Sequence, residues 1–251
     1  MLKKLILNKF STSELEMELI QRKNYNTSPS YKKDYSTMLY SLHRDLEKSI
    51  IQNDAYERFR GVIHNVEKAC HSFPEDALDL MKSFRKMISL ELSYSYIPQI
   101  VYNGNGNDFY LSMPITYMDN GEVEFLKREK VVINQEDKVL VSSPYDINKW
   151  LNAIKREEDF DMKLSDPGIP LFFPELNLLL QDSGTVHRSC DIFLNRQNQQ
   201  LKVWQYDDSP LYEHISTDGV NWFNVNDNEE LVYDYRLALL FEIRRREKEL
   251  E

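Results

Sequence analysis

The sequence has few of the residues that mark disulfide-rich, metal-binding or membrane-spanning proteins. Its 251 residues include two cysteines, Cys70 and Cys190, which lie far apart and form neither a disulfide framework nor a zinc motif. No apolar run approaches the roughly 20 residues of a membrane span. The apolar run Leu5–Leu7 near the start is too short for a signal peptide. We therefore expect a cytoplasmic protein with no membrane partner.

Glycine is scarce as well, with 7 residues, which argues against a glycine-rich dinucleotide-binding fold. The segment Asn103–Asn107, NGNGN, lacks the Lys and Ser/Thr of a P-loop and the third glycine of a dinucleotide-binding loop. Asn and Gly tolerate positive φ, so we interpret this segment as a turn. His43, His64 and His71 show no metal-ligand spacing, and we expect structural roles for them.

The negative charge is concentrated in the second part of the chain. Residues 1–98 hold 15 Lys and Arg against 13 Asp and Glu, whereas residues 99–251 hold 16 against 28, a net charge of −12. Contacts to phosphates supply most of the affinity of non-specific nucleic-acid binding. Such binding is therefore not expected, although a local basic pocket is compatible with this charge.

Apolar periodicity predicts an α+β protein with a helical region over residues 1–96 and a mixed-sheet domain with a C-terminal helix over residues 97–251. Capping signals and apolar spacing predict helices over 11–21, 34–52, 54–70, 74–94, 143–156, 189–194 and 228–248, with a linker over 24–33. Alternation and turn residues predict strands over 97–102, 108–117, 122–133 and 139–142, one near 176–180, one ending at 206, and a hairpin of 211–216 with 220–225. The turn Asp119-Asn120-Gly121 predicts a further hairpin, between the strands over 108–117 and 122–133. The remaining segments, 157–166 and 168–174, are predicted as an acidic loop and an apolar link.

The turn Gly184–Ser189 gathers more reactive residue types than any other part of the chain. It follows a Leu-rich strand and leads into the predicted helix 189–194, so its backbone amides would lie at a helix N-terminus, which attracts anions. Gly184 permits a sharp turn and close backbone approach. Thr185 and Ser189 add hydroxyl groups. The turn therefore predicts a site for phosphate or carboxylate.

Two side chains of this turn are the catalytic candidates. Arg188 offers a planar donor pair suited to phosphate, and His187 can act as an acid or a base near neutral pH. Structural roles are the alternative, with His187 bonded to a backbone carbonyl and Arg188 paired with an acidic residue. Glu175 and Asp182 flank the preceding strand and could serve as a base or as Mg²⁺ ligands, although exposed loop acids are the commoner outcome.

The run Ser183-Gly184-x-x-His187-Arg188 between a strand and a helix resembles the ParB/sulfiredoxin-like superfamily. The segment 139–146, VLVSSPYD, followed by a helix, is similar to the start of such domains. Leu211-Tyr212 and Asp218-Gly219 match an "LY…DG" segment of an uncharacterised bacterial and phage family of ParB-like proteins. The resemblance covers roughly residues 130–225.

The resemblance implies a ParB/sulfiredoxin-like domain that holds nucleotide phosphates at Gly184, Thr185, His187, Arg188 and Ser189. The second arginine box of the ParB clamp is missing. The sulfiredoxin cysteine precedes its histidine, whereas Val186 does so here. What carries over is therefore phosphate binding rather than a DNA clamp or phosphosulfinyl chemistry.

Two functions follow. The first is a nucleotide- or phosphate-binding protein, with a nucleoside triphosphate and Mg²⁺ as cofactors, that catalyses phosphoryl transfer or hydrolysis. The second is a non-catalytic module that binds a protein partner, for example a phage or mobile-element protein that binds a host defence protein. Its acidic surface and 15 tyrosines suit an interface.

Overall fold

The computed structural model describes residues 29–103, 113–136, 138–156, 168–181, 185–194, 200–224 and 229–251. The chain divides into two compact units, Met1–Asn53 and Asp54–Glu251. The first unit is described only through the backbone of helix α3, and the helix predicted over 11–21 lies outside the described residues. The second unit holds the sheets and the remaining helices, and the predicted α+β class with a C-terminal helix is confirmed.

Helices α3 and α4 are both longer than the sequence predicts. Helix α3 spans Pro29–Ser72 without a break, so the prediction of separate helices over 34–52 and 54–70, and of a linker reaching residue 33, is wrong. The polar residues Asn53 and Asp54 do not interrupt α3, because neither of them is a proline. The stripe predicted for the later helix is confirmed, because its Phe59, Ile63, Val66 and Cys70 are buried in the core.

The segment Ser72–Glu75 predicts a capped helix start, and helix α4 (Ala77–Asn103) follows the short 3-10 helix η1 (Pro74–Asp76) there. The predicted capping by Ser72 is wrong, because Phe73 is the N-cap residue and the Ser72 hydroxyl donates to the carbonyl of Lys68 in α3. The prediction of a strand over 97–102 is wrong, because these residues form the last turns of α4, which contains Pro98. Ile97 and Ile100 are both buried, and their spacing of three is helical. The predicted division after residue 96 falls inside this helix.

A five-stranded sheet forms the centre of the second unit, in the order β3-β7-β5-β6-β4. Its strands are β3 (Arg128–Asn134), β4 (Val139–Ser142), β5 (Leu171–Phe173), β6 (Leu178–Gln181) and β7 (Gln200–Tyr206). Strands β5 and β7 run parallel, β3 is antiparallel to β7, and β4 and β6 run parallel to each other but antiparallel to β5. Strand β5 is the apolar segment that was predicted as a link.

Side chains alternate between two cores because successive strand residues point to opposite faces. Leu178 and Leu180 lie in one core with α8, whereas Leu179 between them lies in the other core with Trp150 and Cys190. The second core is covered by helices α5 (Ile147–Arg156) and α6 (Thr185–Phe193). Both faces of the sheet are therefore buried at β6, which explains the continuous apolar run of this strand.

Two smaller sheets complete the unit. The predicted hairpin at Asp119–Gly121 is confirmed: β1 (Thr116–Asp119) pairs with β2 (Glu122–Phe125), and Asn120 and Gly121 have φ of 50° and 86°. The single strand predicted over 122–133 is divided, since residues 126 and 127 separate β2 from β3. Of the strand predicted over 108–117, residues 108–112 lie outside the described residues.

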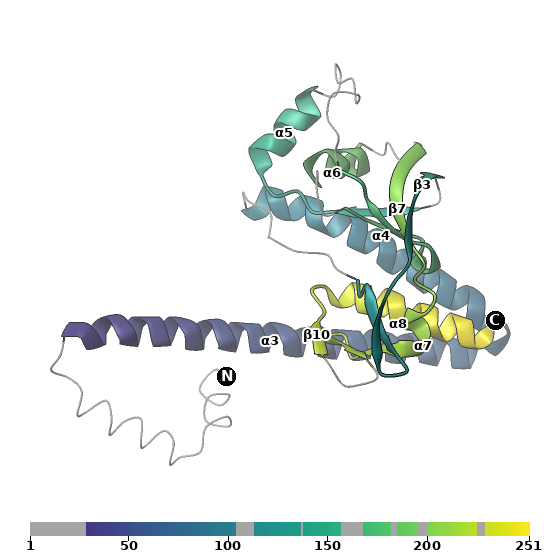
Figure 1. Ribbon diagram of the computed structural model, residues 1–251, viewed down its shortest axis with the longest axis horizontal. Helices are drawn as coiled ribbons and strands as arrows, with labels where there is room; N and C mark the ends of the chain where they lie inside the picture. The colour runs from purple at the N-terminus through teal and green to yellow at the C-terminus, as the bar shows by residue number, and fades with distance from the viewer. Residues whose placement is uncertain are drawn as a thin grey trace, which may run out of the picture. The chain divides into compact units, whose positions relative to one another are not determined.

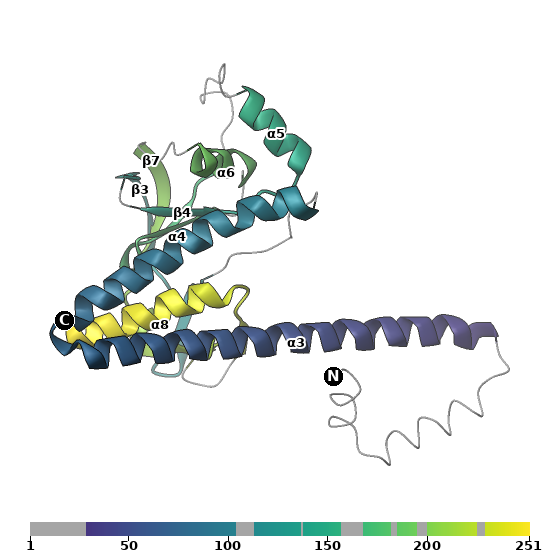
Figure 2. The same cartoon turned by 180° about the vertical axis from the view of Figure 1, so that it is seen from behind.

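The second hairpin is also confirmed, with a different beginning. Residues 211–214 form the helical turn α7 (Leu211–His214) rather than a strand, and β8 (Ile215–Thr217) then pairs with β9 (Asn221–Asn224). Strand β10 (Glu229–Leu231) pairs with β9, so the C-terminal helix begins later than predicted, at Tyr235. Helix α8 (Tyr235–Leu250) lies alongside α4 in both views (Figures 1 and 2).

Within the described part of the chain, no helix combines the length and apolarity that crossing a membrane requires.

Candidate functional site

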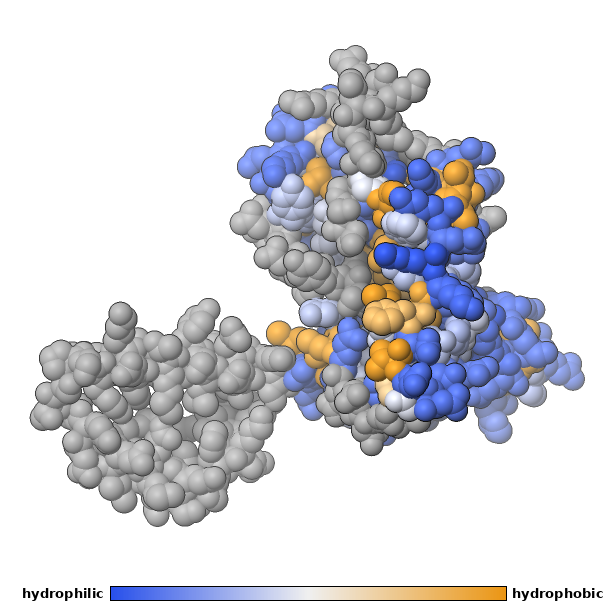
Figure 3. Space-filling view, viewed as in Figure 1, coloured by the Kyte–Doolittle hydropathy of each residue, from blue (hydrophilic) through white to orange (hydrophobic). Residues whose placement is uncertain are grey.

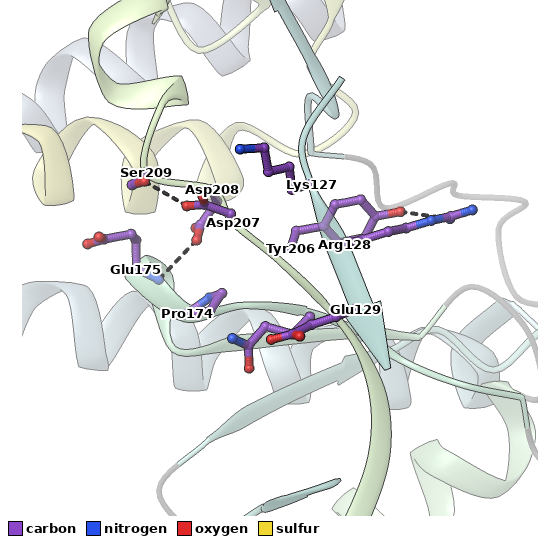
Figure 4. Close-up of a pocket in the computed structure, with 10 residues that line it drawn as sticks. Lys127, Arg128, Glu129, Pro174, Glu175, Tyr206, Asp207, Asp208 and Ser209 are labelled. Carbon is purple, nitrogen blue, oxygen red and sulfur yellow. Dashed lines mark hydrogen bonds between the residues drawn. The ribbon is translucent and has the colours of Figure 1, made fainter. Parts of the chain in front are cut away.

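The candidate site is a pocket of about 580 Å³ at one edge of the five-stranded sheet (Figure 4). Three strands end or begin there: β5 ends before Pro174, β7 ends before Asp207, and β3 begins after Lys127. The amide of Asp207 donates a 2.9 Å hydrogen bond to the carbonyl of Lys127, which extends the β3–β7 ladder to the pocket. Ligand sites commonly lie beyond the carboxyl ends of parallel strands, as β5 and β7 are. We call it the Asp208 pocket.

Asp208 is the buried acid of this pocket. Its side chain is 1% exposed, and Oδ1 accepts a 3.3 Å hydrogen bond from the amide of Glu175. Oδ2 is buried and has no hydrogen-bond partner among the described residues. Burial raises the pKa of Asp208 to about 7, and the nearby charges of Glu175 and Asp207 add to the rise. Asp208 therefore changes between its protonated and ionised forms near neutral pH.

Glu175 lies beside Asp208, but its environment favours the ionised carboxylate, whereas that of Asp208 favours the protonated form. Its Oε2 accepts from Arg244 at 2.8 Å, and its Oε1 pairs with Lys248 at 2.9 Å, both from α8. Burial opposes ionisation of Glu175, but the hydrogen bonds from Lys248 and Arg244 outweigh it and lower the pKa of this carboxyl. Four carboxyl groups line the pocket, those of Glu129, Glu175, Asp207 and Asp208; of these, Glu175 is held ionised and Asp208 titrates near pH 7.

Two cations, Lys127 and Arg128, line the pocket at the start of β3. Arg128 donates a 3.2 Å hydrogen bond to the hydroxyl of Tyr206, and its guanidinium lies 4.8 Å from the ring centroid of Trp204. Lys127 makes no ion pair within 4.0 Å among the described residues. In Figure 4 its side chain extends on the side of the pocket where Asp207 and Ser209 lie. In Figure 4 Arg128 extends away from Asp208 and Glu175, so Lys127 is the cation that can hold an anionic group near the acid.

The loop after β7 is ordered by its own side chains. The hydroxyl of Ser209 donates a 2.7 Å hydrogen bond to Oδ1 of exposed Asp207. Below the loop, Tyr212 stacks on Phe241 at 4.6 Å, and its buried hydroxyl has no partner among the described residues. Burial raises the pKa of Tyr212 well above its ordinary value, with the charge of Asp208 as a further cause. Tyr212 is therefore a neutral neighbour of the acid.

The residues of the predicted anion site lie at the opposite edge of the sheet. Gly184 lies outside the described residues, as does Asp182. Thr185 begins α6, earlier than the predicted helix start at Ser189, and its carbonyl accepts a 2.8 Å hydrogen bond from Ser142 at the end of β4. Because β6 and β4 run antiparallel to β5, their carboxyl ends point away from the Asp208 pocket.

The structure places the predicted side chains of α6 in different environments. Arg188 is 7% exposed and pairs with Asp191 at 3.2 Å, while its Nε has no partner among the described residues. Ser189 is buried, and its hydroxyl donates to the carbonyl of Val186. His187 and Thr185 are half-buried. The phosphate-binding role of this turn stays a prediction, and Arg188 has the acidic partner that the structural alternative requires.

Sequence reasoning missed Asp208 and its neighbours Asp207, Lys127 and Arg128. The signal was an Asp-Asp-Ser-Pro segment directly after an alternating strand, a place where polar side chains commonly form sites. Nothing in the sequence alone shows that β3 begins and β5 ends beside this segment.

Metal binding finds no support among the residues the structure describes, where no group of three or more His, Cys, Asp or Glu side chains could hold an ion. Both oxygens of Glu175 are already bound by cations, so Glu175 is not available as the Mg²⁺ ligand that the sequence suggested.

Comparison with known proteins gives a family but no activity. No curated protein and no solved structure matches the chain. One family model matches residues 24–251, which include every element of the second unit and the whole Asp208 pocket. The chain therefore belongs to the family of unknown function DUF6710.

Proposed function

We propose that the protein is an enzyme that binds a small phosphate-bearing substrate in the Asp208 pocket and uses Asp208 to transfer a proton. The observation that carries the proposal is the buried carboxyl of Asp208, whose Oδ2 has no hydrogen-bond partner among the described residues, beside Glu175, which Arg244 and Lys248 hold in place. The pKa of Asp208 is accordingly raised to about 7, and that of Glu175 is lowered. A pair of titratable groups held in opposite protonation states is the arrangement that divides acid and base roles in many active sites.

The proposed chemistry is hydrolysis or phosphoryl transfer. Ionised Asp208 accepts the proton of an attacking water or hydroxyl as its oxygen forms a bond to phosphorus. The bond to the leaving oxygen breaks, and protonated Asp208 can then return the proton to that oxygen. Because its pKa lies near 7, both forms are populated at neutral pH. Lys127 would stabilise the negative charge on the phosphoryl oxygens.

A nucleoside triphosphate with Mg²⁺ is the first substrate to test. The resemblance to ParB/sulfiredoxin-like proteins implies nucleotide binding at Gly184–Ser189, so it supports the class of ligand and not its place in the Asp208 pocket. The pocket itself supports a phosphate-bearing ligand through Lys127 and through its volume of about 580 Å³, which is in the usual range for small-molecule sites.

The experiment measures phosphate release from ATP, CTP and a simple phosphate monoester, with and without Mg²⁺, by the wild type, Asp208→Asn and Asp79→Asn. Loss of an acid–base group lowers the rate by about 10²–10⁴-fold, so Asp208→Asn should be impaired to this extent. Asp79→Asn removes an equal charge from an exposed position on α4, outside the Asp208 pocket, and should retain most activity. Equal rates for wild type and Asp208→Asn, or no turnover of any substrate by the wild type, would reject the proposal.

A non-catalytic interaction module is the second candidate, and the β1–β2 hairpin favours it. All four residues of β2 are exposed, and they include Val123 at 59% and Phe125 at 70%. Figure 3 shows apolar atoms gathered over this part of the visible face. The test is a pull-down from bacterial lysate with wild type and with the double variant Val123→Ser, Phe125→Ser. Recovery of the same proteins by both, or of none by either, would remove this candidate.

A further inference from the structure

A second pocket, separate from the Asp208 pocket, is rich in positive charge. It has a volume of about 360 Å³ and lies between α4, the turn before β4 and the segment Leu176-Asn177. Helix α4 contributes a stripe of residues spaced by three and four, so that they share one face. The members of this stripe are Lys82, Arg85, Lys86, Ser89, Leu90 and Ser93. We call it the Lys86 pocket.

Four cations line the Lys86 pocket against a single carboxylate among its described lining residues. The cations are Lys82, Arg85, Lys86 and Lys138, and the carboxylate is Glu136; Asp137 lies outside the described residues. The three lysines make no ion pair within 4.0 Å with any described residue. The whole chain has a net charge of −10, but this cluster produces a local positive electrostatic potential. Such a potential attracts anions.

Arg85 is held rigidly in the wall of the pocket. Its Nε pairs at 2.8 Å with Glu247, which is fully buried, and its Nη1 donates to the carbonyl of Glu175 at 3.2 Å. Its Nη2 makes no hydrogen bond to a described residue. A guanidinium fixed through two of its nitrogens keeps the third in a defined direction, which suits binding of an oxyanion.

The hydroxyl groups of the two serines in the stripe are not available to donate to an anion. The hydroxyl of Ser89 donates 2.8 Å to the carbonyl of Arg85, and that of Ser93 donates 2.6 Å to the carbonyl of Leu140. Their hydrogens are therefore occupied, and the charged donors left for a ligand are the ammonium groups and Arg85. Asn177 adds a neutral side-chain amide to the lining.

From this geometry we propose that the Lys86 pocket binds a phosphate or pyrophosphate group. The charge of such a group matches the excess of cations, and the volume of about 360 Å³ accommodates a diphosphate. The segment Pro174–Asn177 separates this pocket from the Asp208 pocket, with Glu175 lining one and Asn177 the other. The proposal does not depend on catalysis at Asp208.

The experiment titrates the full chain calorimetrically at low, fixed salt with orthophosphate, pyrophosphate and a nucleoside diphosphate. The test variant is Lys86→Met with Lys138→Met. The matched control is Lys68→Met with Lys155→Met, which removes the same charge from exposed lysines of α3 and α5. Wild type should bind pyrophosphate, the test variant should bind it at least tenfold more weakly, and the control should stay within about twofold, since exposed charges at a distance are screened.

A nucleoside diphosphate that binds more tightly than pyrophosphate would identify the ligand as a nucleotide, and equal affinity would identify a free diphosphate or another phosphate ester. Three results would overturn the proposal: no binding to the wild type, unchanged affinity in the test variant, or an equal loss in the control. The same titrations with Asp208→Asn should match wild type, which separates this site from the Asp208 pocket.

Discussion

The backbone amide of Glu175 donates its hydrogen to Oδ1 of Asp208, and the two carboxyl groups of this pair have pKa values shifted in opposite directions. The amide comes from the end of β5 and the acid from the end of β7, so the parallel pairing of these strands brings them together. Four predictions on stability and binding follow, two from this pocket and two from other parts of the fold.

The first prediction concerns stability and pH. The folded-state pKa of Asp208, about 7, lies above its ordinary value of 3.8, so the folded protein binds the extra proton between these values. Stability from the protonated group is present below about pH 4 and is lost as pH rises to 7. Asp208→Asn should therefore gain stability relative to wild type over this range, by at most roughly 4 kcal/mol. Urea denaturation at several pH values measures this; a pH-independent difference would contradict it.

The second prediction concerns Glu175→Gln. The substitution removes the charge that pairs with Arg244 and Lys248, and leaves half-buried cations beside Glu247 and Glu251. We expect a loss of about 1–3 kcal/mol, below the 3–5 kcal/mol of a fully buried pair. Glu249→Gln is the control, because its pair with Arg245 is exposed and should contribute under about 1 kcal/mol. Equal effects of the two substitutions on chemical denaturation would refute the prediction.

The third prediction compares three glycines. Gly219 has φ of 89°, and a Cβ there would lie 2.4 Å from Cβ of Phe59, so Gly219→Ala should destabilise the protein by more than about 2 kcal/mol. Gly121 has φ of 86° but open space around it, so Gly121→Ala should cost only about 1 kcal/mol. Gly61 lies in α3 with nothing nearby, and Gly61→Ala should stabilise by about 0.5–1 kcal/mol. Melting temperatures would test this order, and any other order would count against it.

The fourth prediction concerns the Arg188–Asp191 pair in α6. Both side chains are buried, so Arg188→Ala leaves Asp191 without its cation and should cost about 3–5 kcal/mol. Replacing the pair together, with Arg188→Met and Asp191→Leu, should recover most of this loss. The recovered variant also tests the predicted phosphate role, by titration of ATP and CTP with Mg²⁺. Binding equal to that of wild type would remove Arg188 from the nucleotide site.

The sequence correctly predicted the helices, strands and turns whose conformation is determined by residues close together in the chain. The hairpin at Asn120-Gly121 follows from two residues that tolerate positive φ. The capping signal at Ser72–Glu75 marks where the chain leaves α3 and enters η1 and α4. Strand β4 matches its prediction residue for residue, because four apolar and small residues are bounded by polar ones.

Elements whose cause is tertiary were misassigned. Residues 97–102 have β-forming side chains, yet they continue α4 because Ile97 and Ile100 reach the core at helical spacing. Strand β5 has only three residues and two flanking prolines, and its neighbours β6 and β7 make it a strand. The Asp208 pocket was missed for the same reason, since three strand ends distant in sequence form it.

The strand order β3-β7-β5-β6-β4 also fixes the order of events during synthesis. Residue 128 in β3 pairs with residue 206 in β7, so this edge of the sheet has no neighbour until the ribosome has made the last strand. Strand β5 likewise has no neighbour on one side until β7 has been synthesised. Domains whose pairings are distant in sequence fold slowly and expose their strand edges meanwhile. The growing chain thus carries the apolar residues Val131, Val132 and Ile133 unpaired, a segment that chaperones would be expected to bind.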